Sequence, residues 1–393
     1  MRFPEFHGEW EKCKLGDIAT LTKGSGISKD QRSATGTPCI LYGELYTTYK
    51  SEVIDYVVSK TDISDKNLVR SSANDIIIPS SGETAIDIST ARCVLSPDVL
   101  LGGDLNIIRL KDGDGRFFSY QLNGVRKHDI AKIAQGVSVV HLYGESIKGL
   151  TVSFPSNKEQ QKISTLLSLI DERIATQSKL IEKLESLIKG LNDSLYAQYG
   201  GKVLTSFAEL GTSYSGLSGK SAQDFGSGKP FITYLNVYSN NAINENDFQY
   251  VAIKDGEKQN IVEYGDVLFT LSSETPEEVG IGSVYLGKEK VYLNSFCFGI
   301  HITNTEVAFP PYLSYYVSST AFRKFIYPYA QGSTRFNLCK ADFEKASIKL
   351  PTLENQKRIY SILSHIDSKI ETERQILDLY NSQKQYLLRQ VFI

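Results

Sequence analysis

A long internal repeat constrains this chain more than any other feature. The stretch E-Q-Q-K-I-S-T-L-L-S-L-I-D-E-R-I at 159–174 is matched by N-Q-K-R-I-Y-S-I-L-S-H-I-D-S-K-I at 355–370, with seven of 16 positions identical. Residues 36–46 likewise match 228–238, residues 74–84 match 265–275, and residues 134–138 match 330–334, at offsets of 192, 191 and 196. Because the offset changes so little, the chain holds two copies of one plan, each a globular unit followed by a long helix.

The globular units are predicted to be α+β and rich in strands. Short apolar runs such as 75–78 and 266–269 are bounded by Gly, Ser, Pro and Asn, as is typical of strands between turns. Short helices are expected at 117–134 and 311–329, where the spacing of apolar residues lengthens. The predicted division is a first globular unit at 1–156, a helix at 157–200, a second globular unit at 201–352 and a helix at 353–393.

The two long helices carry an apolar heptad pattern. A single helix cannot bury such a seam alone, so we expect the two to pair as an antiparallel coiled coil with pseudo-two-fold symmetry. Packing of each helix onto its own head is the alternative. Glu373 and Lys384 are expected to weaken the second seam. The predicted interface residues are Ile163, Leu167, Ile170, Ile174, Ile181, Leu184, Ile359, Leu363, Ile366, Ile370 and Leu377.

Motifs for catalysis or metal binding are weak in this chain. Residues 214–221 end in Gly-Lys-Ser but have Tyr214 where a phosphate loop needs its first glycine. The tetrapeptide F-P-P-Y at 309–312 has Phe309 where amino-methylating enzymes need Asn or Asp to accept a hydrogen bond. The five histidines and five cysteines show no ligand spacing, so no metal site and no catalytic residues are predicted.

Composition indicates a protein of the cytoplasm. The cysteines lie far apart, no apolar stretch is long enough for a membrane span, and the first residues do not resemble a signal peptide. The net charge is −2, so any binding of DNA must rely on local basic patches or on partners that share the phosphate contacts.

The chain resembles the specificity subunit of type I restriction-modification systems. The resemblance rests on Q-x-K/R-I followed by I-D after a proline-terminated strand in both copies, and on the opening at 2–18. It implies a non-catalytic subunit in which two target recognition domains each read half of a bipartite sequence in double-stranded DNA. The paired helices would set the spacing and dock methyltransferase subunits, expected to be two, with restriction subunits joining through the complex. The chain would bind no cofactor itself, whereas the assembled complex would use S-adenosylmethionine, ATP and Mg.

Polar loops repeated in both copies contain the candidate DNA contacts. Arginine suits guanine, glutamine and asparagine suit adenine, and glutamate can accept from cytosine, while lysines in Ser/Gly-rich loops suit phosphates. These candidates are Lys23, Lys29, Arg32, Tyr42, Glu44, Gln135, Ser138, Lys220, Tyr234, Asn236, Gln331, Thr334 and Arg335. Two other interpretations remain open at this point. One is a coiled-coil adaptor whose heads bind proteins, and the other is a stand-alone methyltransferase that binds S-adenosylmethionine.

Overall fold

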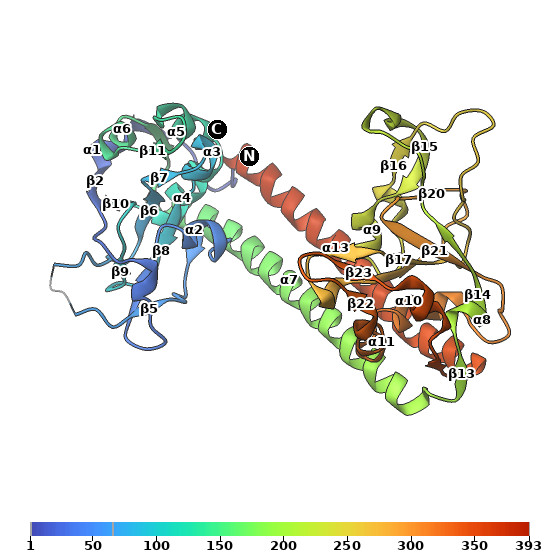
Figure 1. Cartoon of the computed structure of the whole chain (residues 1–393). Coiled ribbons are helices and arrows are strands. Elements are labelled where there is room, and N and C mark those ends of the chain that lie inside the picture. Colours follow the sequence, from blue (N-terminus) through green and yellow to red (C-terminus); the bar gives the residue numbers. More distant parts are fainter. Residues whose placement is uncertain (1, 65–66, 393) are drawn as a thin grey trace. The chain divides into compact units, whose positions relative to one another are not determined.

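The computed structural model describes residues 2–64 and 67–392. The chain divides into two compact units, Met1–Lys179 with Arg374–Ile393, and Leu180–Glu373. We call residues 2–156 the first head and residues 201–352 the second head. Each unit contains one head and a segment of each long helix (Figure 1).

The first head is built on a five-stranded sheet in the order β2-β10-β6-β8-β4. All its neighbours are antiparallel except β4 and β8. Three isoleucines of β6, Ile76, Ile77 and Ile78, are fully buried, as expected of a central strand. The strands are β1 (Glu11–Lys14), β2 (Ala19–Lys23), β3 (Thr37–Ile40), β4 (Val53–Ile54), β5 (Lys60–Thr61), β6 (Asp75–Pro79), β7 (Ser81–Gly82), β8 (Arg92–Val94), β9 (Leu100–Leu101), β10 (Leu105–Leu110), β11 (Val140–His141) and β12 (Thr151–Phe154).

The second head repeats this plan. Its main sheet has the order β14-β21-β17-β19, which corresponds to β2-β10-β6-β8, and the smaller sheets correspond as well. A parallel pair joins β15 to β20, just as one joins β3 to β9. The strands are β13 (Val203–Thr205), β14 (Gly211–Ser215), β15 (Phe225–Ile232), β16 (Gln249–Val251), β17 (Val267–Thr270), β18 (Ser272–Ser273), β19 (Gly282–Val284), β20 (Tyr292–Leu293), β21 (Cys297–Ile302), β22 (Ala330–Gln331), β23 (Phe336–Leu338) and β24 (Ile348–Leu350).

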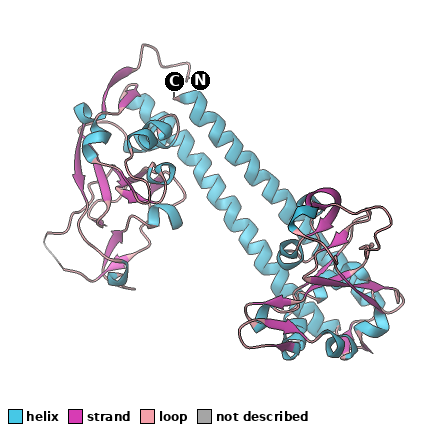
Figure 2. Ribbon diagram, turned by 45° about the horizontal axis from the view of Figure 1, so that its top comes forward, coloured by secondary structure: helices cyan, strands magenta, loops and turns pink. Residues whose placement is uncertain are grey.

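Short helices lie between these strands (Figure 2). In the first head they are α1 (Leu15–Ile18), η1 (Lys29–Gln31), α2 (Glu44–Thr47), α3 (Ala85–Ile88), α4 (Gly115–Asn123), α5 (Lys127–Ile133) and α6 (Gly144–Lys148). In the second head they are α8 (Phe207–Leu210), η2 (Ala222–Asp224), α9 (Tyr234–Ser239), η3 (Glu245–Asp247), η4 (Pro276–Glu278), α10 (Pro310–Tyr316), α11 (Thr320–Ile326), η5 (Tyr327–Tyr329) and α12 (Lys340–Lys345). The α+β prediction is confirmed.

Short helices occupy the regions 117–134 and 311–329, as predicted, and each region holds two α-helices in succession. Gly124 ends α4, where its N–H donates to the Tyr120 carbonyl at 2.9 Å. In the second head, Ser319 caps the start of α11 by accepting from the Phe322 N–H at 3.2 Å. A glycine at a helix end and a serine at a helix start are common helix boundaries.

The long helices are α7 (Asn157–Tyr199) and α13 (Leu353–Val391). The first half of α7 shares a unit with the second half of α13, where Asp171 meets Lys384 at 2.6 Å. The second half of α7 shares the other unit with the first half of α13, where the Arg358 guanidinium lies 5.5 Å from the Tyr199 ring centre. The two helices therefore pack antiparallel, as predicted. None of the described helices is long and apolar enough to cross a membrane.

Every predicted seam residue is buried or half-buried. At the start of α7, however, the seam does not contact α13 alone. Ile163, Leu167 and Ile170 belong to the hydrophobic core of the first head, together with Leu387, Leu388 and Val391 at the end of α13 and Phe392, which follows it. The helices thus pack on the head as well as on each other.

The expected weakness at Lys384 is also corrected. Its side chain is only 11 % exposed, and it forms ion pairs with Asp171 and Glu52 of the first unit. Burial by itself lowers the pKa of Lys384, but the two carboxylates outweigh this effect and the pKa is raised. Lys384 is therefore a cationic anchor between α13 and the first head. Glu373, also buried, is paired with Lys369.

The glutamine of the repeated Q-x-K/R-I motif joins each long helix to its head. Gln160 accepts from the Asp114 N–H at 3.0 Å, and Gln356 accepts from the Phe309 N–H at 2.8 Å. Each side-chain amide also donates to the carbonyl of the proline five residues earlier, at 2.8 and 2.9 Å. Both glutamines are almost fully buried, so the repeated residue has the same structural role in both units.

Replacing Gln160 by Ala is expected to lower the free energy of unfolding by about 1–3 kcal/mol, because buried backbone groups lose their partners. Gln356→Ala should have a similar effect in the second unit. Gln161→Ala is the matched control, since Gln161 is exposed one position further along α7. Chemical denaturation of the full chain measures all three. A Gln160→Ala loss no larger than that of the control would contradict this role.

Candidate nucleic-acid interface

Each head contains a pocket built partly from the same repeated element. In the first head the start of α2 lines a pocket of about 770 Å³, and in the second head α9, which corresponds to α2, lines one of about 760 Å³. Tyr42 and Tyr234, which match in the repeat, lie at these two pockets.

The pocket of the first head brings together four predicted residues, Lys29, Arg32, Tyr42 and Glu44. Glu44 is 5 % exposed and accepts a hydrogen bond from the Leu41 N–H at 2.8 Å and another from the Ser59 hydroxyl. Its carboxylate lies 3.7 Å from the Arg32 guanidinium. Glu44 is thus occupied within the fold and positions Arg32, while Lys29 and Tyr42 are exposed.

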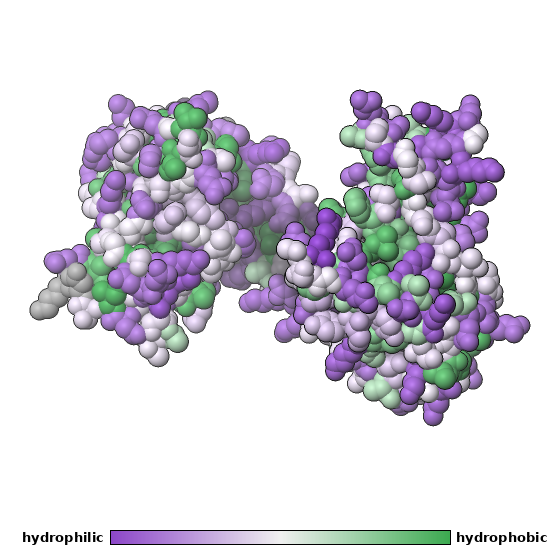
Figure 3. All heavy atoms as spheres, viewed as in Figure 1, coloured by the Kyte–Doolittle hydropathy of each residue, from purple (hydrophilic) through white to green (hydrophobic). Residues whose placement is uncertain are grey.

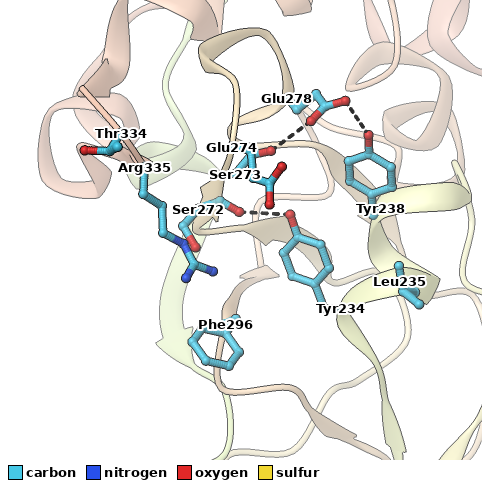
Figure 4. Close-up of a pocket in the computed structure, with 10 residues that line it drawn as sticks. All are labelled: Tyr234, Leu235, Tyr238, Ser272, Ser273, Glu274, Glu278, Phe296, Thr334 and Arg335. Carbon is cyan, nitrogen blue, oxygen red and sulfur yellow. Dashed lines mark hydrogen bonds between the residues drawn. The ribbon is translucent and has the colours of Figure 1, made fainter. Parts of the chain in front are cut away.

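The pocket of the second head has a wall of hydrogen-bonded side chains (Figure 4). Tyr234 donates to the Ser272 carbonyl at 2.9 Å. Glu278 accepts from the Tyr238 hydroxyl at 2.7 Å and from the Ser273 hydroxyl at 2.9 Å. These hydrogen bonds lower the pKa of Glu278, and the bond from Tyr238 contributes most. The same bond raises the pKa of Tyr238. This wall is therefore rigid and carries a negative charge.

Five further side chains line the same pocket, and three of them had no sequence signal. Thr334 and Arg335, both predicted, reach it from the loop between β22 and β23. Phe296 is 57 % exposed and Leu235 is 69 % exposed. Together with Glu274 they were missed, because no local pattern distinguishes an apolar or acidic residue at a pocket from one elsewhere on the surface.

Two of the predicted contact residues are bonded within the second head. The Lys220 side chain is 6 % exposed, and its ammonium pairs with Glu257 at 2.5 Å. The Asn236 side chain is buried; it donates to the Asn244 carbonyl at 2.8 Å and accepts from the Asn244 N–H at 3.0 Å. Both residues stabilise loops of the second head.

The remaining predicted residues are exposed on loops or at strand ends. Lys23 ends β2, and Gln135 and Ser138 lie in the loop before β11. Gln331 ends β22. The face drawn in Figure 3 is largely hydrophilic on both heads, with scattered apolar side chains. Within residues 2–64 and 67–392, no group of three His, Cys, Asp or Glu residues is arranged to hold a metal ion.

Comparison with known proteins places this fold in a family. The family model described as the type I restriction modification DNA specificity domain matches residues 7–186 and again residues 211–379. The chain belongs to this family. It is a non-catalytic specificity subunit, and its two heads are the two target recognition domains, as the resemblance implied.

Relatives and solved structures agree with this assignment. Two proteins of Methanocaldococcus jannaschii, named as the MjaX and MjaVIII type I restriction enzyme specificity subunits, are 25 % and 22 % identical to it. They align with 94 % and 95 % of this chain and with 89 % and 90 % of their own lengths. The fold resembles the crystal structure of the type I restriction-modification S subunit from M. genitalium, with a TM-score of 0.59 at 16 % identity. That match covers 100 % of this chain and 99 % of the other. A second structure, from work on assembly of a type I restriction-modification system, has a TM-score of 0.60 at 14 % identity and covers 99 % and 98 %.

Proposed function

We propose that the two heads of this specificity subunit each read one half of an asymmetric bipartite sequence in double-stranded DNA. The observation that supports this is the pair of pockets built on corresponding elements, α2 and α9. The first presents Lys29, Arg32 and Tyr42, whereas the second presents Glu274, Phe296 and Arg335. Because different side chains select different base edges, the two half-sites should differ.

Partner subunits complete the complex in this proposal. The long helices expose large apolar side chains suited to protein contacts, Leu169, Leu187, Leu379 and Tyr386, at 52 %, 52 %, 69 % and 60 % exposure. We assign these helices to the docking of two methyltransferase subunits, with restriction subunits joining through the complex. The partners would also share the phosphate contacts that a chain of net charge −2 cannot supply alone.

Cofactor chemistry would belong to those partners. S-adenosylmethionine would serve the methyltransferase subunits, and ATP and Mg would serve the restriction subunits. The complex would act on genomic DNA in the cytoplasm.

Single-molecule sequencing of methylated genomic DNA tests this function. Cells that express the subunit with its partners should methylate one bipartite motif that is absent from cells lacking the subunit. An unchanged methylome, or a motif without an unread centre, would contradict the proposal. In that case, binding of other proteins by the heads would favour the adaptor alternative.

The proposal also predicts that helix length sets the unread spacer. Inserting seven residues after Lys179 and seven before Arg374 preserves both heptad patterns and adds about 10 Å to each helix, the length of about three base pairs. The methylated motif should keep both half-sites while the spacer lengthens by roughly one to three base pairs. Insertion into one helix alone is the control and should abolish methylation. An unchanged spacer with both insertions would refute the role of the helices.

A further inference from the structure

Two side chains of opposite charge at the second-head pocket have no ionic or hydrogen-bond partner among the described residues. Arg335 and Glu274 are both exposed, and within the described residues neither forms a hydrogen bond or an ion pair. The ionised carboxylate of Glu278 is bonded internally to Tyr238 and Ser273, and the Tyr234 hydroxyl donates to the Ser272 carbonyl (Figure 4). Arg335 and Glu274 are therefore the charged groups that remain available to a ligand in this pocket.

Strand pairing holds these two residues next to each other. The antiparallel register between β18 and β23 pairs Ser272 with Asn337 and Ser273 with Phe336. The next positions along the same register are Glu274 and Arg335. The Arg335 loop is also tight, because Gly332 has φ +144° and a Cβ there would lie 2.1 Å from the Arg335 carbonyl oxygen. The two charged side chains thus arise from adjacent, well-defined backbone positions.

The charges around this pocket disfavour a phosphate as the ligand. One guanidinium, that of Arg335, stands beside two carboxylates, Glu274 and Glu278, and the lowered pKa of Glu278 keeps that group ionised. A phosphate would meet a net negative pocket. The exposed Phe296 and Leu235 add apolar surface, which suits the flat, partly apolar edge of a base more than a free anion.

The pair of groups matches the major-groove edge of one base pair. Guanine presents two acceptors, O6 and N7, which an arginine can contact with two N–H donors, and cytosine presents an N4 amino donor, which a carboxylate accepts. An A·T pair offers no such double acceptor to Arg335. A G·C pair therefore satisfies both Arg335 and Glu274.

The geometry points to a G·C pair in the half-site read by the second head, with its guanine bound by Arg335 and its cytosine bound by Glu274. This inference rests on the proposed function of the heads.

The first head cannot read a base pair in this way. The register between β7 and β11 pairs Gly82 with Val140, so the next pair is Glu83 and Val139. These correspond in the repeat to Glu274 and Arg335. Val139 is 52 % exposed and has no donor, so the bidentate contact with guanine is absent.

Arg335→Val, which places the first head's residue in the second head, tests the inference in the full complex. Methylome sequencing should show one G·C position of one half-site relaxed to other base pairs, with the other half-site unchanged. The ratio of the affinity for a site with the G·C pair to that for a site with another base pair at this position should fall roughly 10- to 100-fold. Glu274→Ala should relax the same position. Lys324→Ala is the control, because it removes an exposed cation of α11 outside the pocket, and it should leave the motif unchanged.

A second measurement leaves the protein intact, so it does not depend on the folding of a variant. The wild-type complex is bound to duplexes in which 7-deazaguanine replaces each guanine in turn, which removes the N7 acceptor. One such replacement should weaken binding of the duplex to the wild-type complex but not to the Arg335→Val complex.

A bipartite motif that Arg335→Val leaves unchanged, or that relaxes only at A·T pairs, would overturn this inference alone. If Arg335→Val and Glu274→Ala relaxed the specificity at two different positions of the motif, the two residues would not contact the same base pair. Absence of any bipartite motif in the wild type would instead overturn the proposed function.

Discussion

Ending the chain at Gln385 is expected to unfold the first head while the second head remains folded. The deletion removes four residues that are at most 8 % exposed in the core of the first head, Leu387, Leu388, Val391 and Phe392. Loss of each such side chain costs about 2–5 kcal/mol, and a domain is stable by only about 5–15 kcal/mol. Hydrogen exchange should therefore show loss of protection in β6 and β10 but not in β17 and β21.

Two single substitutions near the end of α13 compare a side chain that packs in the core with one that is exposed. The centre of the Phe392 ring lies 5.1 Å from that of the Phe117 ring and 6.5 Å from that of the Trp10 ring. Phe392→Ala should therefore lower the free energy of unfolding by about 3–5 kcal/mol. Tyr386→Ala, an aromatic residue that is 60 % exposed near the same helix end, should change stability by less than about 0.5 kcal/mol. Equal effects of the two substitutions would contradict the contribution of the helix end to the core.

Lys384→Ala is expected to destabilise the first unit by about 3–5 kcal/mol, because it leaves two buried carboxylates without their cation. Asp171 lies 2.6 Å from the ammonium, and Glu52 is the second partner. The raised pKa of Lys384 means that its stabilisation is fully present at neutral pH and is lost only as the pH rises through that pKa in alkali. Urea denaturation at neutral pH measures the loss.

Arg389→Ala is the matched control, since Arg389 is an exposed cation of α13 that lies five residues after Lys384. A triple variant, Lys384→Met with Glu52→Gln and Asp171→Asn, should recover most of the stability because it removes the buried charges together. If Lys384→Ala and Arg389→Ala were equally stable, the buried ion pairs would contribute nothing measurable.

The second unit attaches its helices without this cation. Ile188 takes the place of Lys384 in the repeat and is buried. Asn192 of α7 instead donates to the Tyr315 carbonyl at 2.8 Å, and Asp193 accepts from the Thr320 N–H at 2.9 Å. In both units the second half of a long helix is therefore attached to the head, but by different residues and different chemistry.

Patterns in the sequence were enough to predict the two-copy plan, the strand-rich heads and the long paired helices. These features follow from patterns that are local or repeated along the chain, such as the heptad seam from Ile163 and the two buried glutamines of the motif. A periodic pattern specifies which face of a helix is apolar, and the repeat shows that the same fold is built twice.

Which polar side chains are free and which are bonded, by contrast, depends on the packing of segments that are remote in the sequence. From the sequence, Lys220 was expected to contact a phosphate and Lys384 to weaken the second heptad seam. In the structure, each ammonium forms ion pairs with carboxylates from distant segments. Glu274 and Arg335 are neighbours solely because β18 pairs with β23. The physical reason is that burial and ionic partners depend on which remote segments pack together, and the residue types along one segment do not encode that pairing.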